Sequence, residues 1–362
     1  APYSSGQNNV AIGYQSLKAF TTGDNNTAVG YQAGQSLTTA DDNTFIGIYA
    51  GYDVTTGGQN TVVGRGALGN NQSGTSNTIM GYQAAAGSHG NSHDGNAFFG
   101  YRAGFTVTTG DYNIAVGQSA LQTLTSGDRN VAIGAEAGFR TSTTTQNVFV
   151  GDRAGRENIG SNAVAIGYLS GQYATGSSNT FVGAEAGKGG TTSAPFSSGK
   201  SNVAIGYQAL AGFTTAQRMV TIGYEAMTDV TTGEDSVAIG YQAGYYNSGS
   251  YSVSIGMSAG YYPSAGSNVY MGYRAGNISR GNSNTAIGAS AIRYLNAGNQ
   301  NVAIGNTAGS YLLGTQTTIV GSQAGRFASG SYNTFMGYKA GYGGTTSAPY
   351  SSGENNVAVG AY

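Results

Sequence analysis

The sequence contains no cysteine and no tryptophan, and only 9% of its 362 residues are charged. The absence of cysteine excludes disulfides, zinc sites built on thiolates and cysteine catalysis, but it does not identify a cellular compartment. The net charge of −1 provides no basic surface of the kind that binds nucleic acid or anionic lipid. We therefore expect no nucleic-acid partner.

Long apolar runs are also absent. No run approaches the roughly 18 residues of a membrane-spanning helix, so we expect no membrane insertion of this segment. No signal peptide is visible and the chain does not begin with Met. The opening string APYSSGQNNVAIGYQ has near-copies that begin at Ala194 and Ala348, which predicts that the chain is a segment of a longer polypeptide.

What the sequence does contain is glycine, 62 residues of it, placed in one repeated motif, N-[V/T]-[A/F]-[I/V]-G-[Y/x]-x-A-[G/L]. The glycine in the middle of this motif, here called the central glycine, recurs every 16 or 17 residues, apart from one interval of 19 and two of 23. These intervals predict one repeated unit with loop insertions near 87–95, 188–200 and 342–354. We therefore expect residues 1–362 to form a single continuous repeat domain. The central glycines are residues 13, 30, 47, 64, 81, 100, 117, 134, 151, 167, 183, 206, 223, 240, 256, 272, 288, 305, 321, 337 and 360.

Positions in the repeat are numbered here from the central glycine. Position −1 is apolar in all 21 repeats, position −2 in 19 of them, and position −3 is β-branched in all but Ala97. Position +3 is alanine in 18 of 20 repeats and position −4 is asparagine in 16 of 21. Short β-branched runs broken by Gly, Asn, Ser and Thr indicate strands and turns, and no stretch keeps a helical period.

The repeat therefore predicts an all-β fold, a parallel β-solenoid (β-roll) of about 21 turns of 16–17 residues. Each turn would hold a short strand before the central glycine, a tight corner there, and a second short strand through the alanine. Alanine at +3 suits a narrow interior, and asparagine at −4 suits a corner, where it tolerates the left-handed region and can stack in amide ladders. The corner asparagines singled out are Asn26, Asn43, Asn60 and Asn77.

Alternation along the strand places positions −3 and −1 on one face and position −2 on the other. Both faces are apolar, and a soluble monomer rarely exposes a long apolar stripe. We expect one face to fill the interior and the −2 face to be buried between chains, unless a flattened coil shelters both faces internally. The predicted core columns comprise position −1 (Ile12, Val29, Ile46, Val63) and position +3 (Ala33, Ala50, Ala103, Ala137).

The strings NTAVGYQAG (Asn26 to Gly34), NVAIGAEAG (Asn130 to Gly138) and NVAIGYQAL (Asn202 to Leu210) resemble the head repeats of YadA-type trimeric autotransporter adhesins. They are also similar to the NTAIGYQAL repeats in stalks of phage tail fibres and of surface proteins with an endosialidase-type chaperone domain. The resemblance implies a left-handed β-roll, three chains side by side, and a location outside the cell or on a virion. The adhesin repeat is 14 residues long, however, and no neck, stalk, anchor or chaperone domain is present here.

Few residues suggest chemistry. His89, His93 and Asp94 lie in the single 19-residue interval and are the candidates for a metal site, but we interpret the interval as an exposed polar insertion in one turn, because no other turn repeats these residues. Calcium-binding repeats, a paired glycosidase acid and base, a nucleophile elbow and a phosphate-binding loop are not found. We expect no enzyme and no cofactor.

Two polar or aromatic columns have a functional and a structural interpretation. Tyrosine follows the central glycine in 10 of 21 repeats, which predicts either a sugar-stacking strip or a ladder that stiffens the roll. Threonine at −3 in four consecutive repeats, Thr27, Thr44, Thr61 and Thr78, is compatible with ice binding or with interchange with valine. Candidate N-glycosylation sites occur at Asn25, Asn71 and Asn277.

The sequence thus favours a structural, non-catalytic segment of an extracellular filament or adhesin shaft, located at a cell surface or on a virion. Repetition converts one small unit into length. The expected partner is the chain itself, as a homo-oligomer with a trimer favoured or as an end-to-end fibril. The alternatives are a tail-fibre or adhesin head that binds surface glycans, and an ice-binding solenoid.

Overall fold

The computed structural model describes residues 4–88, 90–190, 196–263, 265–295, 298–344 and 351–361. Within these ranges the chain is an all-β parallel solenoid without helices, as the repeat predicts. No helix that could cross a membrane is found among them. The chain divides into two compact units, Ala1–Asn179 (unit 1) and Thr180–Tyr362 (unit 2). One continuous solenoid over 1–362 therefore stays a prediction from the repeat spacing.

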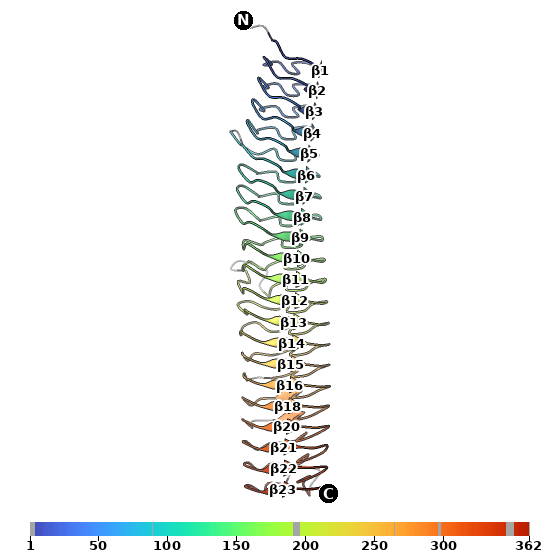
Figure 1. The fold of residues 1–362 in the computed structure, drawn as a ribbon, viewed down its shortest axis with the longest axis vertical. Coiled ribbons are helices and arrows are strands. Elements are labelled where there is room, and N and C mark those ends of the chain that lie inside the picture. Colours follow the sequence, from blue (N-terminus) through green and yellow to red (C-terminus); the bar gives the residue numbers. More distant parts are fainter. Residues whose placement is uncertain are drawn as a thin grey trace. The chain divides into compact units, whose positions relative to one another are not determined.

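Each repeat contributes one three-residue strand immediately before its central glycine, and Figure 1 shows these strands following one another within each unit. Unit 1 contains β1 (Val10–Ile12), β2 (Thr27–Val29), β3 (Thr44–Ile46), β4 (Thr61–Val63), β5 (Thr78–Met80), β6 (Ala97–Phe99), β7 (Ile114–Val116), β8 (Val131–Ile133), β9 (Val148–Val150) and β10 (Val164–Ile166). Unit 2 contains β11 (Thr180–Val182), β12 (Val203–Ile205), β13 (Val220–Ile222), β14 (Val237–Ile239), β15 (Val253–Ile255), β16 (Val269–Met271), β17 (Ile278–Ser279), β18 (Thr285–Ile287), β19 (Tyr294–Leu295), β20 (Val302–Ile304), β21 (Thr318–Val320), β22 (Thr334–Met336) and β23 (Val357–Val359).

Neighbouring strands pair in parallel and in the register of the repeat. In β1 and β2, Val10 lies opposite Thr27 and Ala11 opposite Ala28. Parallel strands place the same repeat position directly above itself in the next turn, so each column of the sequence becomes a column in space. The 23-residue interval keeps this register, since Phe181 lies opposite Ala204.

The second strand expected in every turn is absent from most of them. The residues after the central glycine form consecutive turns, and the only other described strands are β17 and β19, which pair with each other beyond the alanine position. Their backbone groups still bond from turn to turn, as in Gly138 N–H to Ala154 O at 2.9 Å. The interval after the glycine therefore continues the ladder without extended geometry.

Positions −2 and +3 fill the interior. The alanines at +3, Ala33, Ala50, Ala103 and Ala137 among them, are completely buried, which confirms the prediction of a narrow core. The large side chains at −2, such as Phe45, are buried with them. Methyl groups on one side leave room for rings on the other at the usual density of a protein interior.

Side-chain volume is exchanged between positions −2 and +4 of the same turn. Phe149 at −2 is accompanied by Gly155 at +4, where an added Cβ would lie 2.3 Å from the ring. Two turns earlier the pair is Ala115 and Leu121, and both are buried. Other turns pair two small residues, as Ala132 with Gly138, and there the ring of Phe149 from the next turn fills the space, since an added Cβ at Gly138 would lie 2.7 Å from it.

The central glycine allows the turns to approach closely. Gly134 has φ +137°, and a Cβ there would lie 2.3 Å from the carbonyl oxygen of Gly151 in the next turn. Neither the backbone angle nor the space admits another residue. This is why glycine is the invariant residue of the repeat.

The asparagines at −4 form a buried amide ladder. The Nδ2 atoms of Asn43 and Asn60 each donate to the Oδ1 of the asparagine one turn earlier at 3.1 Å, and the backbone N–H of Asn43 donates to Asn26 Oδ1 at 3.0 Å. Asn77 continues the ladder. The expected left-handed conformation is one residue away, at position −5, where Asn25 has φ +58°. The corner is therefore made by two adjacent residues with separate tasks.

Candidate interaction surface

The face of each strand that points away from the core is apolar. It carries positions −3 and −1, because side chains alternate along a strand and position −2 points inward. In β3, Phe45 is fully buried whereas Ile46 is 41% exposed, and in β1, Ile12 is 59% exposed. We call positions −3, −1 and +1 of each unit its outward face.

This arrangement corrects the predicted core. The −1 residues Ile12, Val29, Ile46 and Val63 are exposed or half-buried, and the −2 face is internal rather than free to lie between chains. Alternation shows only that −1 and −3 share a face, and both faces are apolar. The deciding quantity is volume, because phenylalanine at −2 fills the space opposite the small alanines at +3.

Tyrosines at position +1 extend the outward face beyond the strand. Tyr207, Tyr224 and Tyr241 stack in consecutive turns with ring centroids 5.1 and 5.3 Å apart, and all three are exposed. In unit 1, Tyr14 and Tyr31 stack at 5.3 Å. The predicted ladder therefore exists, and it lies on the surface. It is interrupted in 11 of the 21 repeats, for example at Arg65, Asp152 and Ala184.

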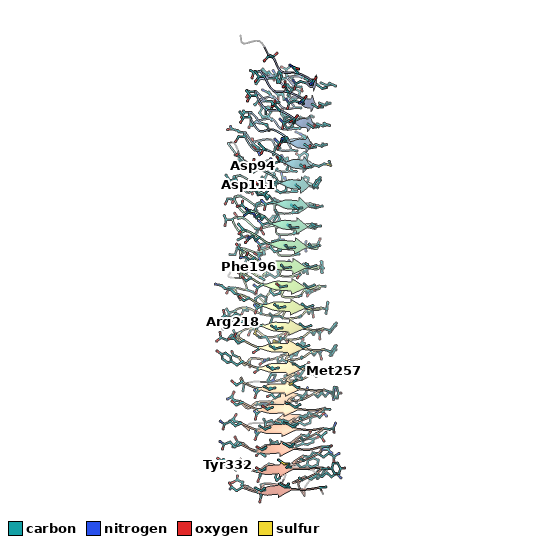
Figure 2. All side chains as sticks on the ribbon, viewed as in Figure 1. Asp94, Asp111, Phe196, Arg218, Met257 and Tyr332 are labelled. Carbon is teal, nitrogen blue, oxygen red and sulfur yellow. The ribbon has the colours of Figure 1, made fainter. Side chains whose placement is uncertain are left out.

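The polar corners lie away from this face. Figure 2 shows Met257, at position +1, on one side of the strands of unit 2, and Arg218 and Tyr332, at position −5, on the other. Arg218 pairs there with Asp235, its Nε lying 2.6 Å from Oδ1, and the pair lowers the pKa of the Asp235 carboxyl. This charged pair of unit 2 thus lies on the side away from the outward face.

Unit 1 carries a ladder of aspartates at position −6. The carboxylate of Asp111 accepts the backbone N–H of Asp94 at 2.7 Å, and Asp128 accepts that of Asp111 at 2.9 Å. Partial burial raises the pKa of the Asp111 carboxyl, and the neighbouring carboxylates add to this effect. Each carboxylate is engaged by backbone, so the ladder is structural.

The candidate metal ligands do not converge. His93 is buried in the amide ladder, with Nδ1 3.1 Å from Asn96 Nδ2, and burial lowers its pKa to about 4. Asp94 instead accepts the backbone N–H of Thr75 at 2.6 Å. His89 lies outside the described residues, and among those described no group of three His, Asp or Glu side chains could hold a metal ion.

The candidate glycosylation sites differ in accessibility. Asn25 is exposed and Asn277 is half-buried. Asn71 is fully buried, with its Nδ2 3.2 Å from the carbonyl oxygen of His93 and its Oδ1 accepting the N–H of Gly74. A glycan on Asn71 would displace these bonds, so the expectation fails at that residue.

The sequence reasoning missed a group of aromatic residues in unit 2. Tyr245 and Tyr246 lie beside Tyr261 and Tyr262 of the next turn, and Tyr246 and Tyr262 stack with ring centroids 4.6 Å apart. The signal was present as two Tyr-Tyr pairs spaced sixteen residues apart. The spacing alone places both pairs at the same repeat position.

The chain was compared with known proteins. No family model matches it, and no curated protein does. The likeness to adhesin head repeats therefore stays a resemblance of motif.

Proposed function

We propose that this chain is a structural, non-catalytic segment of an extracellular filament or adhesin shaft, and that copies of it pack against one another through the outward face. The observation that carries the proposal is an exposed apolar column repeated in turn after turn of both units. It includes residues such as Ile133 and Ile166 in unit 1 and Ile205 and Ile239 in unit 2.

The extent of this face argues for a protein partner. Monomeric proteins rarely expose contiguous apolar patches larger than a few hundred Å². Every strand before a central glycine adds two outward side chains, a β-branched one in all but β6 and a further apolar one, and tyrosines border many of them. A second copy of the same chain offers matching columns at the same spacing, so a symmetric homo-oligomer would cover the face turn by turn. The adhesin-like motif favours three copies, and an end-to-end fibril is the other arrangement.

The composition supports an extracellular role without catalysis. Charge is scarce, and the loops are rich in glycine, serine and threonine. Aspartates of unit 1 bond backbone N–H groups, as at Asp94 and Asp111, and Glu136 pairs with Arg153. These features suit a segment that stands in solvent and presents loops.

Ice binding remains the second proposal from the sequence. Thr27, Thr44, Thr61 and Thr78 occupy the outward face of β2, β3, β4 and β5. The column gives way to Ala97 and then to Ile114, which are apolar. Four threonines flanked by valine, isoleucine and methionine suit association better than an ice-ordering plane.

The test is sedimentation of the purified chain over a range of concentrations. We expect a mass above that of the monomer for the wild-type chain, and dissociation toward monomer for Ile133→Glu combined with Ile239→Glu. The matched control is Ser126→Glu with Thr232→Glu, because these residues are exposed but lie outside the outward face. The same circular dichroism in all three proteins establishes that folding is intact. A monomeric wild type at every concentration, or an unchanged mass in the Ile variant, contradicts the proposal.

A further inference from the structure

Unit 2 has a second aromatic column, which we call the side ladder. It occupies position +6 and comprises Tyr246, Tyr262, Tyr294, Tyr311 and Phe327. The last three stack in succession with centroids 5.1 and 5.3 Å apart. In unit 1 the same position carries mainly polar residues, namely Ser36, Asp53, Asn70, Thr106, Thr123, Arg140 and Glu157, with one isolated tyrosine, Tyr173. The side ladder is therefore particular to unit 2 rather than a requirement of the repeat.

The side ladder is interrupted once, at Ile278, whose side chain is shorter than a tyrosine ring. A hollow of about 430 Å³ lies beside this interruption. It is lined by Tyr246, Ser248, Tyr262, Pro263, Ile278 and Arg280. Its volume is within the range of small-molecule sites, which are mostly apolar with a few polar groups that fix orientation.

The walls of the hollow are held by the backbone ladder. Tyr262 N–H donates to the carbonyl oxygen of Asn277 at 2.8 Å, and Ile278 N–H donates to that of Arg293 at 2.9 Å. Arg280 N–H donates to the carbonyl oxygen of Leu295 at 3.0 Å. Because neighbouring turns fix these residues, a ligand would order little backbone on binding.

The lining residues combine two kinds of chemistry. Tyr262 is 46% exposed, and because one face of its ring is stacked on Tyr246, the other face is the rigid flat surface offered to the C–H face of a pyranose ring. Arg280 is exposed and presents a guanidinium group, whose planar fork matches a carboxylate. Ser248 adds a hydroxyl that can bond a sugar hydroxyl. None of the lining residues is acidic.

We propose that this hollow binds an acidic sugar residue, a uronate, within a polysaccharide. The sugar ring stacks on Tyr262, its carboxylate pairs with Arg280, and one of its hydroxyls bonds Ser248. The site shares no residue with the outward face, so it is independent of self-association. It would give the filament a polysaccharide contact on one unit only.

The experiment is isothermal titration of the full chain with trigalacturonate, with neutral galactotriose as the uncharged counterpart. We expect trigalacturonate to bind measurably and more tightly than galactotriose. Arg280→Gln should weaken trigalacturonate roughly tenfold, the usual effect of losing one charge-assisted hydrogen bond, and leave galactotriose unchanged. Tyr262→Ala should weaken both sugars.

The matched controls are Tyr101→Ala and Arg129→Gln, which remove an exposed tyrosine and an exposed arginine from unit 1. Both should bind as the wild type does. The proposal is overturned if the wild-type chain does not bind trigalacturonate, if it binds galactotriose equally well, or if the unit 2 variants bind no differently from the controls. Circular dichroism identifies any variant that fails to fold, and Tyr262→Phe, which keeps the ring, should then retain binding.

Discussion

The two units share the same backbone turn but differ in the side chains that stabilise its corner. In unit 1 the amide ladder is unbroken from Asn9 to Asn147, each asparagine bonding its predecessor. In unit 2 it is replaced at several turns by Met219, Ser236, Ser252 and Thr317. At Ser252 the backbone N–H finds the hydroxyl of Ser236 instead, at 3.1 Å. Ser236 thus replaces the asparagine acceptor at this turn, whereas Met219 supplies no amide or hydroxyl acceptor, so the corner forms with or without that bond.

The two units also differ in how their largest core rings are accommodated. Phe149 in unit 1 is fully buried and packs beside Gly138 and Gly155, where an added Cβ would lie 2.7 and 2.3 Å from its ring. Tyr270 in unit 2 is also fully buried, and its hydroxyl donates to Ser279 Oγ at 2.7 Å. Ser279 belongs to β17, one of the two extra strands. The hydroxyl of Tyr270 thus links the core to β17, and no such extra strand is found among the described residues of unit 1.

The largest effect is expected from emptying these ring sites. Phe149→Ala should destabilise unit 1 by about 3–5 kcal/mol, because it leaves a cavity in a closely packed core. Adding Gly155→Leu should recover much of this loss, since the double variant reproduces the natural pair Ala115 and Leu121. Denaturant unfolding with hydrogen exchange, which separates the peptides of the two units, is the measurement.

The matched experiment in unit 2 combines Tyr270→Ala with Gly276→Leu. Rescue should be less complete there, because Ser279 Oγ loses its partner. Equal rescue in both units would refute the distinction drawn between their cores. No recovery in unit 1 would refute the exchange of volume between positions −2 and +4.

Acid should weaken unit 1 through His93. Burial lowers the pKa of this imidazole from 6.5 to about 4, so the folded chain favours its neutral form. The contribution of the neutral His93 to the free energy of unfolding is fully present above pH 6.5. It is lost as the pH falls toward 4, because the unfolded chain takes up the proton first. The expected loss is about 3 kcal/mol.

Hydrogen exchange at pH 7 and pH 4.5 measures this effect, with His93→Gly as the comparison. Glycine occupies the same repeat position at Gly74 and Gly110. The variant should lose part of the pH dependence of unit 1, while unit 2, which contains no histidine, should respond identically in both proteins. A variant with an undiminished acid response would show that other groups cause it.

Substitutions in the amide ladder should have a smaller effect on stability. Asn60→Ala removes the acceptor of two Asn77 hydrogen bonds and should cost about 2–3 kcal/mol. Thr317→Asn should instead stabilise unit 2 by about 1 kcal/mol, because its amide can donate to Asn301 Oδ1 in addition to the existing backbone bond. Thermal midpoints of both variants check this, and a destabilised Thr317→Asn would mean that the corner in unit 2 has no room for an amide.

The sequence predicted which repeat positions form columns better than it predicted whether each column faces the core or the solvent. Alanine at +3 was sufficient to identify a narrow core, because no exposed column would hold alanine at Ala137 and at its counterparts. The strand pattern could not distinguish Ile133 outward from Ala132 inward, since both are apolar. That choice depends on the volume summed over several turns, which no single repeat contains.

The sequence analysis misplaced His93 at the surface for a related reason. The 19-residue interval was interpreted as an exposed insertion, yet His93 occupies position −7, where the flanking turns carry Gly74 and Gly110. Counting backward from Gly100 places it in the interior, whereas counting forward from Gly81 does not. An insertion can be located only when the turn is known to keep register at its strand.

The in-register ladder has a mechanical consequence. The hydrogen bonds between turns of a unit join each residue to its counterpart in the next turn, so a force pulling the turns apart loads one layer at a time. Each 17-residue turn that peels away would lengthen the chain by about 55–60 Å, and a 23-residue turn by about 80 Å. Such a unit would extend in a series of small steps and absorb work at each one, instead of breaking in a single event.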